Sequence, residues 1–158
     1  HAAFRKSLTV RDACGLFNRE TYRLLGYLDV WGRWEESLVS SYAAYGFDIS
    51  RAFRRWCRGR SFMHTNHHPK IDCLYDLAAI VLDSRGVRTL DGDVRPPDNL
   101  VHDTCFPVYP EIAAELGFRG SFLYKPPGSF RPFDLESFVN LSYEAYGAHG
   151  DAAHAGEF

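Results

Sequence analysis

The chain has 158 residues, with 18 Lys and Arg against 20 Asp and Glu, which gives a formal net charge of −2. This length suits one domain with a buried core; no apolar run approaches the ~20 residues of a membrane helix, and no signal-peptide pattern opens the sequence. The four cysteines form no CxxC pair, which excludes a zinc ribbon and a thioredoxin-like motif. We therefore expect a soluble protein with free thiols, and a reducing, cytoplasmic compartment follows from them.

Helical signals dominate the first half of the chain. Asn18 is a good N-cap for a helix that runs to Leu25 and is stopped by Gly26. A longer helix follows from a stripe of apolar residues at helical spacing, which we expect to be core: Trp31, Trp34, Leu38, Tyr42 and Tyr45. Asp48 then caps a short helix that ends at Gly59 and has an apolar face of Ile49, Phe53 and Trp56.

Three more helices are predicted in the second half. Pro69 suits the first turn of a helix that buries one face between Ile71 and Leu82 and ends at Gly86. Pro110 starts a short helix to Leu116. The last helix is capped by Asp134 and runs to Tyr146.

These elements define the expected fold class. We predict a mainly α protein, a single helical domain over residues 1–158, with at most one or two short strands, at residues 62–64 and 121–124. Residues 87–99 read as a loop-rich connection because of Pro96-Pro97, and residues from about 147 to 158 as a flexible tail. The chain begins at His1 without Met, so the alternative of the later part of a larger α/β protein stays open.

The segment Arg51–Lys70 is the most unusual part of the sequence. It holds six of the eighteen basic residues, no carboxylate and three of the seven histidines. Four arginines in it share one predicted helix face: Arg51, Arg54, Arg55 and Arg58. A patch of this kind attracts anions, above all phosphates, although a solvated arginine face has about equal weight on charge alone.

The end of this segment has features of a phosphate site. The first backbone N–H groups of the helix after Lys70 have no partner within the helix, and they lie at the positive end of its dipole. Arginine suits phosphate because its planar fork donates two parallel hydrogen bonds. The candidate ligand-binding residues are His64 and five basic residues that would hold the phosphates: Arg54, Arg55, Arg58, Arg60 and Lys70. Nucleic acid is not expected, since the overall charge is acidic and no binding motif occurs; a P-loop and a GxGxxG are absent as well.

Other catalytic patterns are weak. His64, His67 and His68 could be considered as a metal cluster, but Pro69 argues against the continuous helix that would make them converge, and we predict no metal. No GxSxG occurs. Cys14 and Ser61 are conceivable nucleophiles, but neither has a base nearby in the sequence. Asp72 and Asp76, one helical turn apart, could orient a histidine, and we favour the simpler interpretation that they face water.

Three segments carry a resemblance to a known family. They are RSFMHTNHHPKIDCLYDLA, PPDNLVHDTCFPVYPEIAAELGFRGS and DLESFVNLSYEAY. From about Arg51 to Tyr146, the chain resembles the later part of WcbI-type capsular-polysaccharide biosynthesis proteins. That resemblance implies coenzyme A binding and acetyl transfer to a capsule sugar. The family's glycine-asparagine-cysteine-glutamine turn is missing, so no nucleophile role passes to Cys14, and His67 stands where an asparagine is expected before His68-Pro69.

The expected function is therefore a coenzyme A-dependent acyl (acetyl) transferase, or the cofactor-binding part of one, that acts on a carbohydrate hydroxyl. The basic residues would hold the cofactor phosphates, His67 or His68 would deprotonate the hydroxyl, and Asn66 would position the imidazole or polarise the thioester. Direct transfer needs no protein nucleophile, and a covalent route would need one that the sequence does not identify. The expected partners are coenzyme A and the carbohydrate acceptor, with a missing N-terminal part or a second copy of the chain as a further possibility.

Two alternatives from other classes stay open. One is a non-catalytic helical module that docks an acidic partner through its arginine face. The other, less favoured, is a histidine-dependent metal hydrolase.

Overall fold

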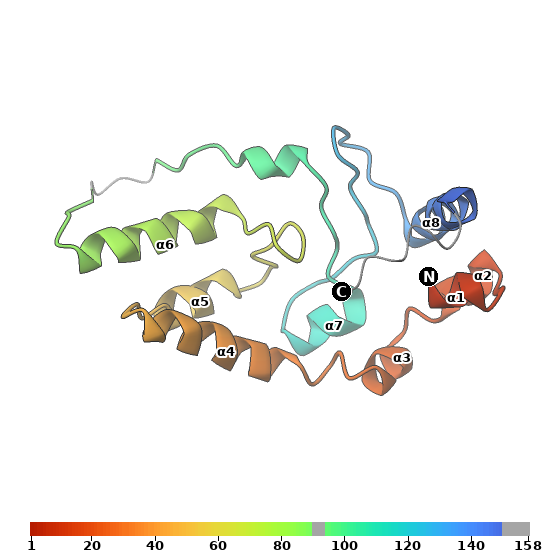
Figure 1. Cartoon of the computed structure of the whole chain (residues 1–158), viewed down its shortest axis with the longest axis horizontal. Helices are drawn as coiled ribbons and strands as arrows, with labels where there is room; N and C mark the ends of the chain where they lie inside the picture. The colour runs from red at the N-terminus through yellow and green to blue at the C-terminus, as the bar shows by residue number, and fades with distance from the viewer. Residues whose placement is uncertain (90–93, 150–158) are drawn as a thin grey trace.

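The computed structural model describes residues 1–89 and 94–149, and side chains up to residue 148. Its elements are, in chain order, α1 (Ala2–Arg5), α2 (Val10–Gly15), α3 (Arg19–Leu24), α4 (Trp31–Ala44), α5 (Ser50–Trp56), α6 (Ile71–Ser84), the 3₁₀ helix η1 (Asn99–His102), α7 (Pro110–Glu115) and α8 (Leu135–His149). The described residues form no sheet, and the predicted mainly α, single-domain fold is confirmed (Figure 1).

Two predicted helices begin at the capping residues that the sequence indicated, whereas α5 has Ile49 instead of Asp48 as its N-cap residue. The Asn18 side chain accepts a hydrogen bond from the Thr21 amide at 2.9 Å and starts α3. Gly26, with φ 73°, follows the end of that helix in a conformation that residues with a Cβ rarely adopt. At the other end of the chain, Asp134 accepts from the Ser137 amide at 2.9 Å and starts α8.

Some elements differ from the prediction. The two N-terminal helices α1 and α2 were not predicted; α2 begins at Thr9, whose hydroxyl accepts from the Asp12 amide at 3.1 Å. The expected short strands at 62–64 and 121–124 are reduced to isolated bridges, such as that between Met63 and Pro69. Helix α8 continues three residues past the predicted end, to His149, and residues 150–158 of the expected flexible tail lie outside the described residues.

Helices α4, α5 and α6 pack together on one side of the molecule (Figure 1). Their core contains Ile49, Ala52, Phe53 and Trp56 of the α5 region and Cys73 of α6. The predicted stripe of α4 is only partly core. Trp31, Leu38 and Tyr42 pack against this core, but Trp34 is 69% exposed and Tyr45 is 82% exposed, because α5 and α6 cover only one side of α4.

A second, aromatic cluster lies on the other side, where α3 contacts α7 and α2 contacts α8. Tyr124 is stacked on Phe138 of α8 with 3.8 Å between ring centroids. The Tyr124 hydroxyl donates a hydrogen bond to the Tyr109 hydroxyl at 3.0 Å, and Tyr109 stacks on the buried Tyr22 of α3. Burial raises the pKa of both Tyr124 and Tyr22, and the hydrogen bond to Tyr109 raises that of Tyr124 further, which keeps both phenols neutral.

Loops join the two helical groups and bring distant segments together. The Phe106 amide donates to the His64 carbonyl at 2.7 Å. Cys105 and Lys125 exchange two backbone hydrogen bonds, of 3.0 and 3.1 Å. Gly120 packs so tightly beside α7 that a Cβ there would stand 2.5 Å from the Val108 carbonyl oxygen. In the described part of the chain, no helix has the length and apolar character needed to cross a membrane.

Candidate functional site

The buried side chain of His64 is the centre of the candidate site. It is 7% exposed, and each ring nitrogen has a partner from a different loop. Nε2 lies 2.8 Å from Oδ2 of Asp98, and Nδ1 lies 3.5 Å from Sγ of Cys105. The arrangement is a carboxylate, an imidazole and a thiol in line.

The Asp98 carboxylate determines which ring nitrogen of His64 carries a hydrogen. Burial alone would raise the pKa of Asp98, but hydrogen bonds from His64 and from the Ile71 amide, at 3.3 Å, outweigh it, and the pKa lies below its ordinary value. An ionised carboxylate only accepts hydrogen bonds. Nε2 of His64 therefore carries the hydrogen, and in a neutral ring the lone pair of Nδ1 faces the thiol of Cys105.

Backbone hydrogen bonds hold this group in place. The His64 amide donates to the His68 carbonyl at 2.8 Å, which closes the loop between them. Inside that loop, the Thr65 hydroxyl accepts from the His68 amide at 3.1 Å. The bond from the Phe106 amide to the His64 carbonyl then sets the neighbouring Cys105 beside the imidazole. The Cys105 Sγ has a second, longer contact, 3.8 Å to the Asp103 carbonyl oxygen.

A basic groove runs past these three side chains and has a volume of about 530 Å³. Its lining includes His64 and Cys105, two carboxylates, Asp72 and Asp98, and three cationic residues: Arg60, Lys70 and Arg119. Burial, followed by the proximity of Arg60, lowers the pKa of Lys70, and its ammonium donates to the Ser61 carbonyl at 2.6 Å. We call this cavity the basic groove.

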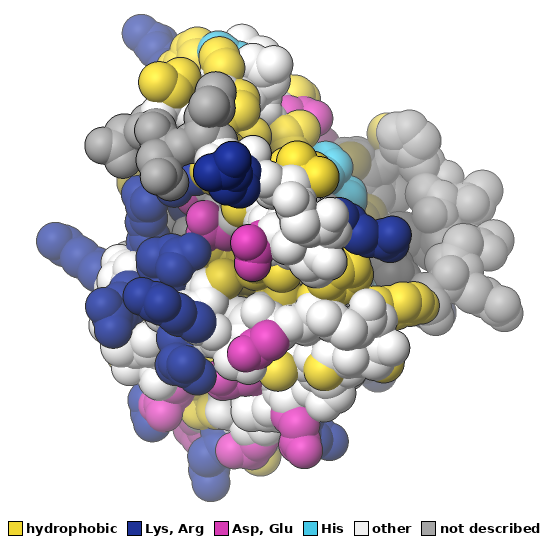
Figure 2. Space-filling view, turned by 90° about the vertical axis from the view of Figure 1, so that its left-hand side faces the viewer, with side chains coloured by type: hydrophobic (Ala, Val, Ile, Leu, Met, Phe, Trp, Pro, Cys, Tyr) yellow, Lys and Arg dark blue, Asp and Glu magenta, His cyan; other side chains and the backbone are white. Residues whose placement is uncertain are grey.

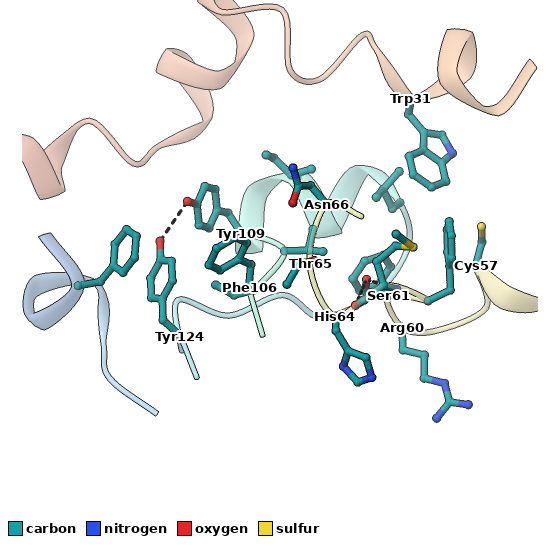
Figure 3. Close-up of a pocket in the computed structure, with 18 residues that line it drawn as sticks. Trp31, Cys57, Arg60, Ser61, His64, Thr65, Asn66, Phe106, Tyr109 and Tyr124 are labelled. Carbon is teal, nitrogen blue, oxygen red and sulfur yellow. Dashed lines mark hydrogen bonds between the residues drawn. The ribbon is translucent and has the colours of Figure 1, made fainter. Parts of the chain in front are cut away.

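A second cavity of about 530 Å³ adjoins the basic groove and is mostly apolar. Aromatic side chains from both helical groups line it, among them Trp31, Phe106 and Tyr109. His64 and Arg60 line both cavities. Figure 3 shows the two side chains extending from the edge of the apolar cavity that lies away from Trp31. The imidazole therefore lies where an apolar chamber meets a cationic one.

The predicted ligand-binding residues separate into two groups. Arg60, His64 and Lys70 come together in the basic groove. Arg54 and Arg58 are exposed on the α5 side of the molecule, and neither is among the described residues that line the two cavities. Figure 2 shows basic side chains gathered along one edge of the face that carries α5 and α6, with acidic side chains beside them.

Arg55 has an internal partner, which corrects the prediction for Asp76. Instead of facing water, Asp76 is buried, with 9% of its surface exposed. Its Oδ2 accepts hydrogen bonds from Arg55 Nη2 and from Trp56 Nε1, both at 2.7 Å. Asp72 does remain half exposed, and it pairs with Arg60 at 3.1 Å. The like charges of the α5 arginines are thus partly neutralised by α6.

The three residues predicted to be catalytic lie at the tip of the loop. Asn66 and His67 are exposed, and Oδ1 of Asn66 lies 2.7 Å from Nδ1 of His67. The rings of His67 and His68 meet edge to face at 4.3 Å. Nδ1 of His68 is buried and has no hydrogen-bond partner among the residues that the structure describes. Asn66 lines the apolar cavity, whereas neither His67 nor His68 lines this cavity or the basic groove.

The histidines do not converge as metal ligands would. The ring of His64 contacts Asp98 and Cys105, whereas the rings of His67 and His68 contact each other. Within the described ranges, no group of three or more His, Cys, Asp or Glu side chains is arranged to hold a metal ion.

Sequence reasoning missed Asp98, Cys105 and Arg119. Asp98 is 34 residues from His64 and Cys105 is 41 residues from it, and both lie in irregular segments where no periodicity marks a shared face. The two nucleophiles considered earlier have other roles. Ser61 exchanges hydrogen bonds with the Met63 backbone, and Cys14 lies in α2, where burial raises the pKa of its thiol.

The fold and the site define a mainly α protein with a buried histidine between an apolar cavity and a cationic groove. The family model of the polysaccharide biosynthesis enzyme WcbI matches residues 1–90. Since this is more than half of the 158 residues, the chain belongs to the WcbI family of polysaccharide biosynthesis enzymes, as the resemblance predicted. The match includes His64 and ends before Asp98 and Cys105, whereas the resemblance had been placed from about Arg51 to Tyr146. Comparisons with curated proteins and with solved structures gave no match.

Proposed function

We propose that the protein is an acyltransferase of polysaccharide biosynthesis that takes an acyl group from a coenzyme A thioester and transfers it to a carbohydrate hydroxyl. Membership of the WcbI family supports the assignment to polysaccharide biosynthesis. The observation that carries the reaction type is the position of His64: it is buried, oriented by a carboxylate, and shared by the walls of the apolar cavity and the basic groove.

The residues of the two cavities fit the chemistry of coenzyme A. Its phosphates need cations, and Arg60, Lys70 and Arg119 supply three around one groove. Its pantetheine arm is largely uncharged and suits walls such as those of the adjoining aromatic chamber. Each volume is within the range of small-molecule sites, roughly 300–1,000 Å³. Among the predicted ligand-binding residues, the proposal therefore favours Arg60 and Lys70, which line the groove, over Arg54 and Arg58, which do not.

His64 is favoured as the general base. A base must reach the proton that it removes, and His64 lines both cavities. The Asp98 carboxylate holds the hydrogen on Nε2 and leaves Nδ1 free to accept a proton, the division of roles that acid–base triads use. His67 and His68 remain the sequence-based prediction for this role, but their place at the loop tip, outside both cavities, is less favourable. Asn66 could still contact the donor from the wall of the apolar cavity.

A calorimetric titration with coenzyme A at low and at raised salt tests the proposal. We expect micromolar binding that weakens with salt, because phosphate–cation contacts are screened. Arg60→Gln should weaken binding about tenfold, which corresponds to about 1.4 kcal/mol, at the low end for a charge-assisted hydrogen bond.

Arg54→Gln is the matched control, since it removes the same charge from an exposed position outside the groove, and its affinity should equal that of the wild type. Absence of both binding heat and thermal stabilisation by coenzyme A would overturn the donor assignment. Equal losses in the two variants would show that the phosphates lie on the arginine face of α5 instead.

A further inference from the structure

We propose that Cys105 is a catalytic nucleophile that carries the acyl group as a thioester between donor and acceptor, with His64 as its base and Asp98 as the residue that orients the imidazole. The inference deepens the proposed function and rests on it for the identity of the donor.

The geometry that supports this role is a chain of three side chains joined by two contacts. The Cys105 Sγ lies 3.5 Å from Nδ1 of His64, and the opposite ring nitrogen lies 2.8 Å from the Asp98 carboxylate. Nucleophile, base and orienting group in this order recur on unrelated folds, where the imidazole takes the proton of the nucleophile. Both sides of the Cys105–His64 pair are fixed by backbone hydrogen bonds, from Lys125 and from Phe106.

Cys105 is also placed where a substrate could reach it. It lines the basic groove together with Arg60 and Lys70. The Lys70 ammonium is close enough for a favourable electrostatic interaction with the Cys105 sulfur. A nearby cation stabilises a thiolate, which is the reactive form of cysteine.

The other three cysteines lack this setting. Burial raises the pKa of Cys57 to about 11 and that of Cys73 to about 12, so both thiols stay protonated at neutral pH. Burial raises the pKa of Cys14 too, and two acidic residues, Glu136 and Asp134, raise it further. Cys105 differs from all three in its contact with the His64 imidazole and in its place in the lining of the basic groove.

The reaction then proceeds in two balanced steps. In the first, Nδ1 of His64 takes the thiol proton and the Cys105 sulfur attacks the carbonyl carbon of the donor thioester. A C–S bond to Cys105 forms, the C–S bond to coenzyme A breaks, and the departing coenzyme A sulfur receives the proton from His64.

In the second step, a carbohydrate hydroxyl gives its proton to His64 and its oxygen attacks the acyl-Cys105 carbonyl. A C–O bond forms, the C–S bond to Cys105 breaks, and the proton returns to the Cys105 sulfur. The sum is transfer of one acyl group from a thioester to an alcohol, with the enzyme unchanged.

Mass spectrometry of the full chain after incubation with acetyl-CoA, without any acceptor sugar, tests the intermediate. We expect one acetyl group on Cys105, released by neutral hydroxylamine as a thioester is. Cys105→Ala should carry none, whereas Cys14→Ala, changed outside the groove, should carry it as the wild type does. Circular dichroism checks that each variant is folded.

His64→Gln keeps the thiol and tests the base separately. Its rate of acetylation at Cys105 should fall about 100-fold, the lower end of what a positioned base contributes. A second donor, para-nitrophenyl acetate, needs no coenzyme A site and should acetylate Cys105 faster than the other cysteines, again in a manner that depends on His64.

These measurements separate the two proposals. If coenzyme A binds by calorimetry but neither donor acetylates Cys105, the covalent step is overturned and the proposed function continues by direct transfer. If coenzyme A does not bind but para-nitrophenyl acetate acetylates Cys105 in a His64-dependent way, the nucleophile is supported and the donor assignment fails. Acetylation only at Cys14 or at lysines would overturn the inference.

Discussion

The contact between Asp76 and the α5 helix gives the sharpest prediction on stability. The carboxylate of Asp76 is buried in α6 and accepts two hydrogen bonds of 2.7 Å, from Arg55 and Trp56. These bonds join α5 to α6 on either side of the loop that carries His64. Asp76→Ala removes the acceptor and leaves both donors in place.

The size of the effect follows from the burial of the two donors. Trp56 is 6% exposed, so its indole N–H is left without a partner and costs about 1–3 kcal/mol. The Arg55 side chain is 54% exposed, so water replaces most of its ion pair, which contributes less than about 1 kcal/mol. We expect a loss of about 3 kcal/mol in the free energy of unfolding. For a chain of this size that lowers Tm by about 6–12 °C.

Urea unfolding followed by circular dichroism and tryptophan fluorescence measures this loss. Asp83→Ala changes an exposed aspartate of the same helix and should stay within about 0.5 kcal/mol of the wild type. A loss below about 0.5 kcal/mol for Asp76→Ala would refute the argument that this carboxylate joins the two helices. Arg55 would then be as free to bind phosphate as its exposed neighbours.

Three other predictions concern the groove and its walls. Asp98→Asn should destabilise the protein at neutral pH, and the difference in unfolding free energy from the wild type should shrink as pH falls below about 4. The pKa of Asp98 is depressed below 3.8 in the folded state, so the stability that its carboxylate contributes is present above that value and is lost on protonation. An unchanged difference in urea unfolding at acid pH would contradict this. Gly120→Ala should lower the free energy of unfolding by about 2–4 kcal/mol, because the new Cβ would meet backbone atoms that cannot move aside. The control Gly147→Ala lies in α8 with open space around it and should be neutral or stabilise by up to about 1 kcal/mol. Equal effects of the two substitutions in thermal melts would count against the packing argument. In a transfer assay with acetyl-CoA and an acceptor sugar, His64→Gln should lower kcat about 100-fold or more. A variant with the kcat of the wild type would show that His64 is not the general base.

Local sequence signals predicted much of the fold. Helices α3 and α8 start at their expected caps, Asn18 and Asp134, because a capping side chain acts over three residues. Helix α2 was missed, although Thr9 caps it, because its six residues are too few for a clear periodicity. The exposure of Trp34 could not be predicted either, since an apolar stripe does not indicate how much of the helix its neighbours cover.

The site was predicted only in part, for a related reason. The basic segment drew attention to Arg60, His64 and Lys70, which the structure brings into one groove. Asp98 and Cys105 complete the site through contacts across 34 and 41 residues, made by loops. Such contacts depend on the packing of the helices around them and leave no spacing in the sequence.

The central claim is that a coenzyme A thioester binds with its reactive carbon beside His64 and Cys105. A crystal structure with a non-reactive coenzyme A thioester analogue tests it most directly. The account predicts phosphates on Arg60 and Lys70 in the basic groove, and the carbonyl carbon within contact of the Cys105 sulfur. An analogue bound along the exposed arginines of α5, with its carbonyl remote from the His64 ring, would contradict it.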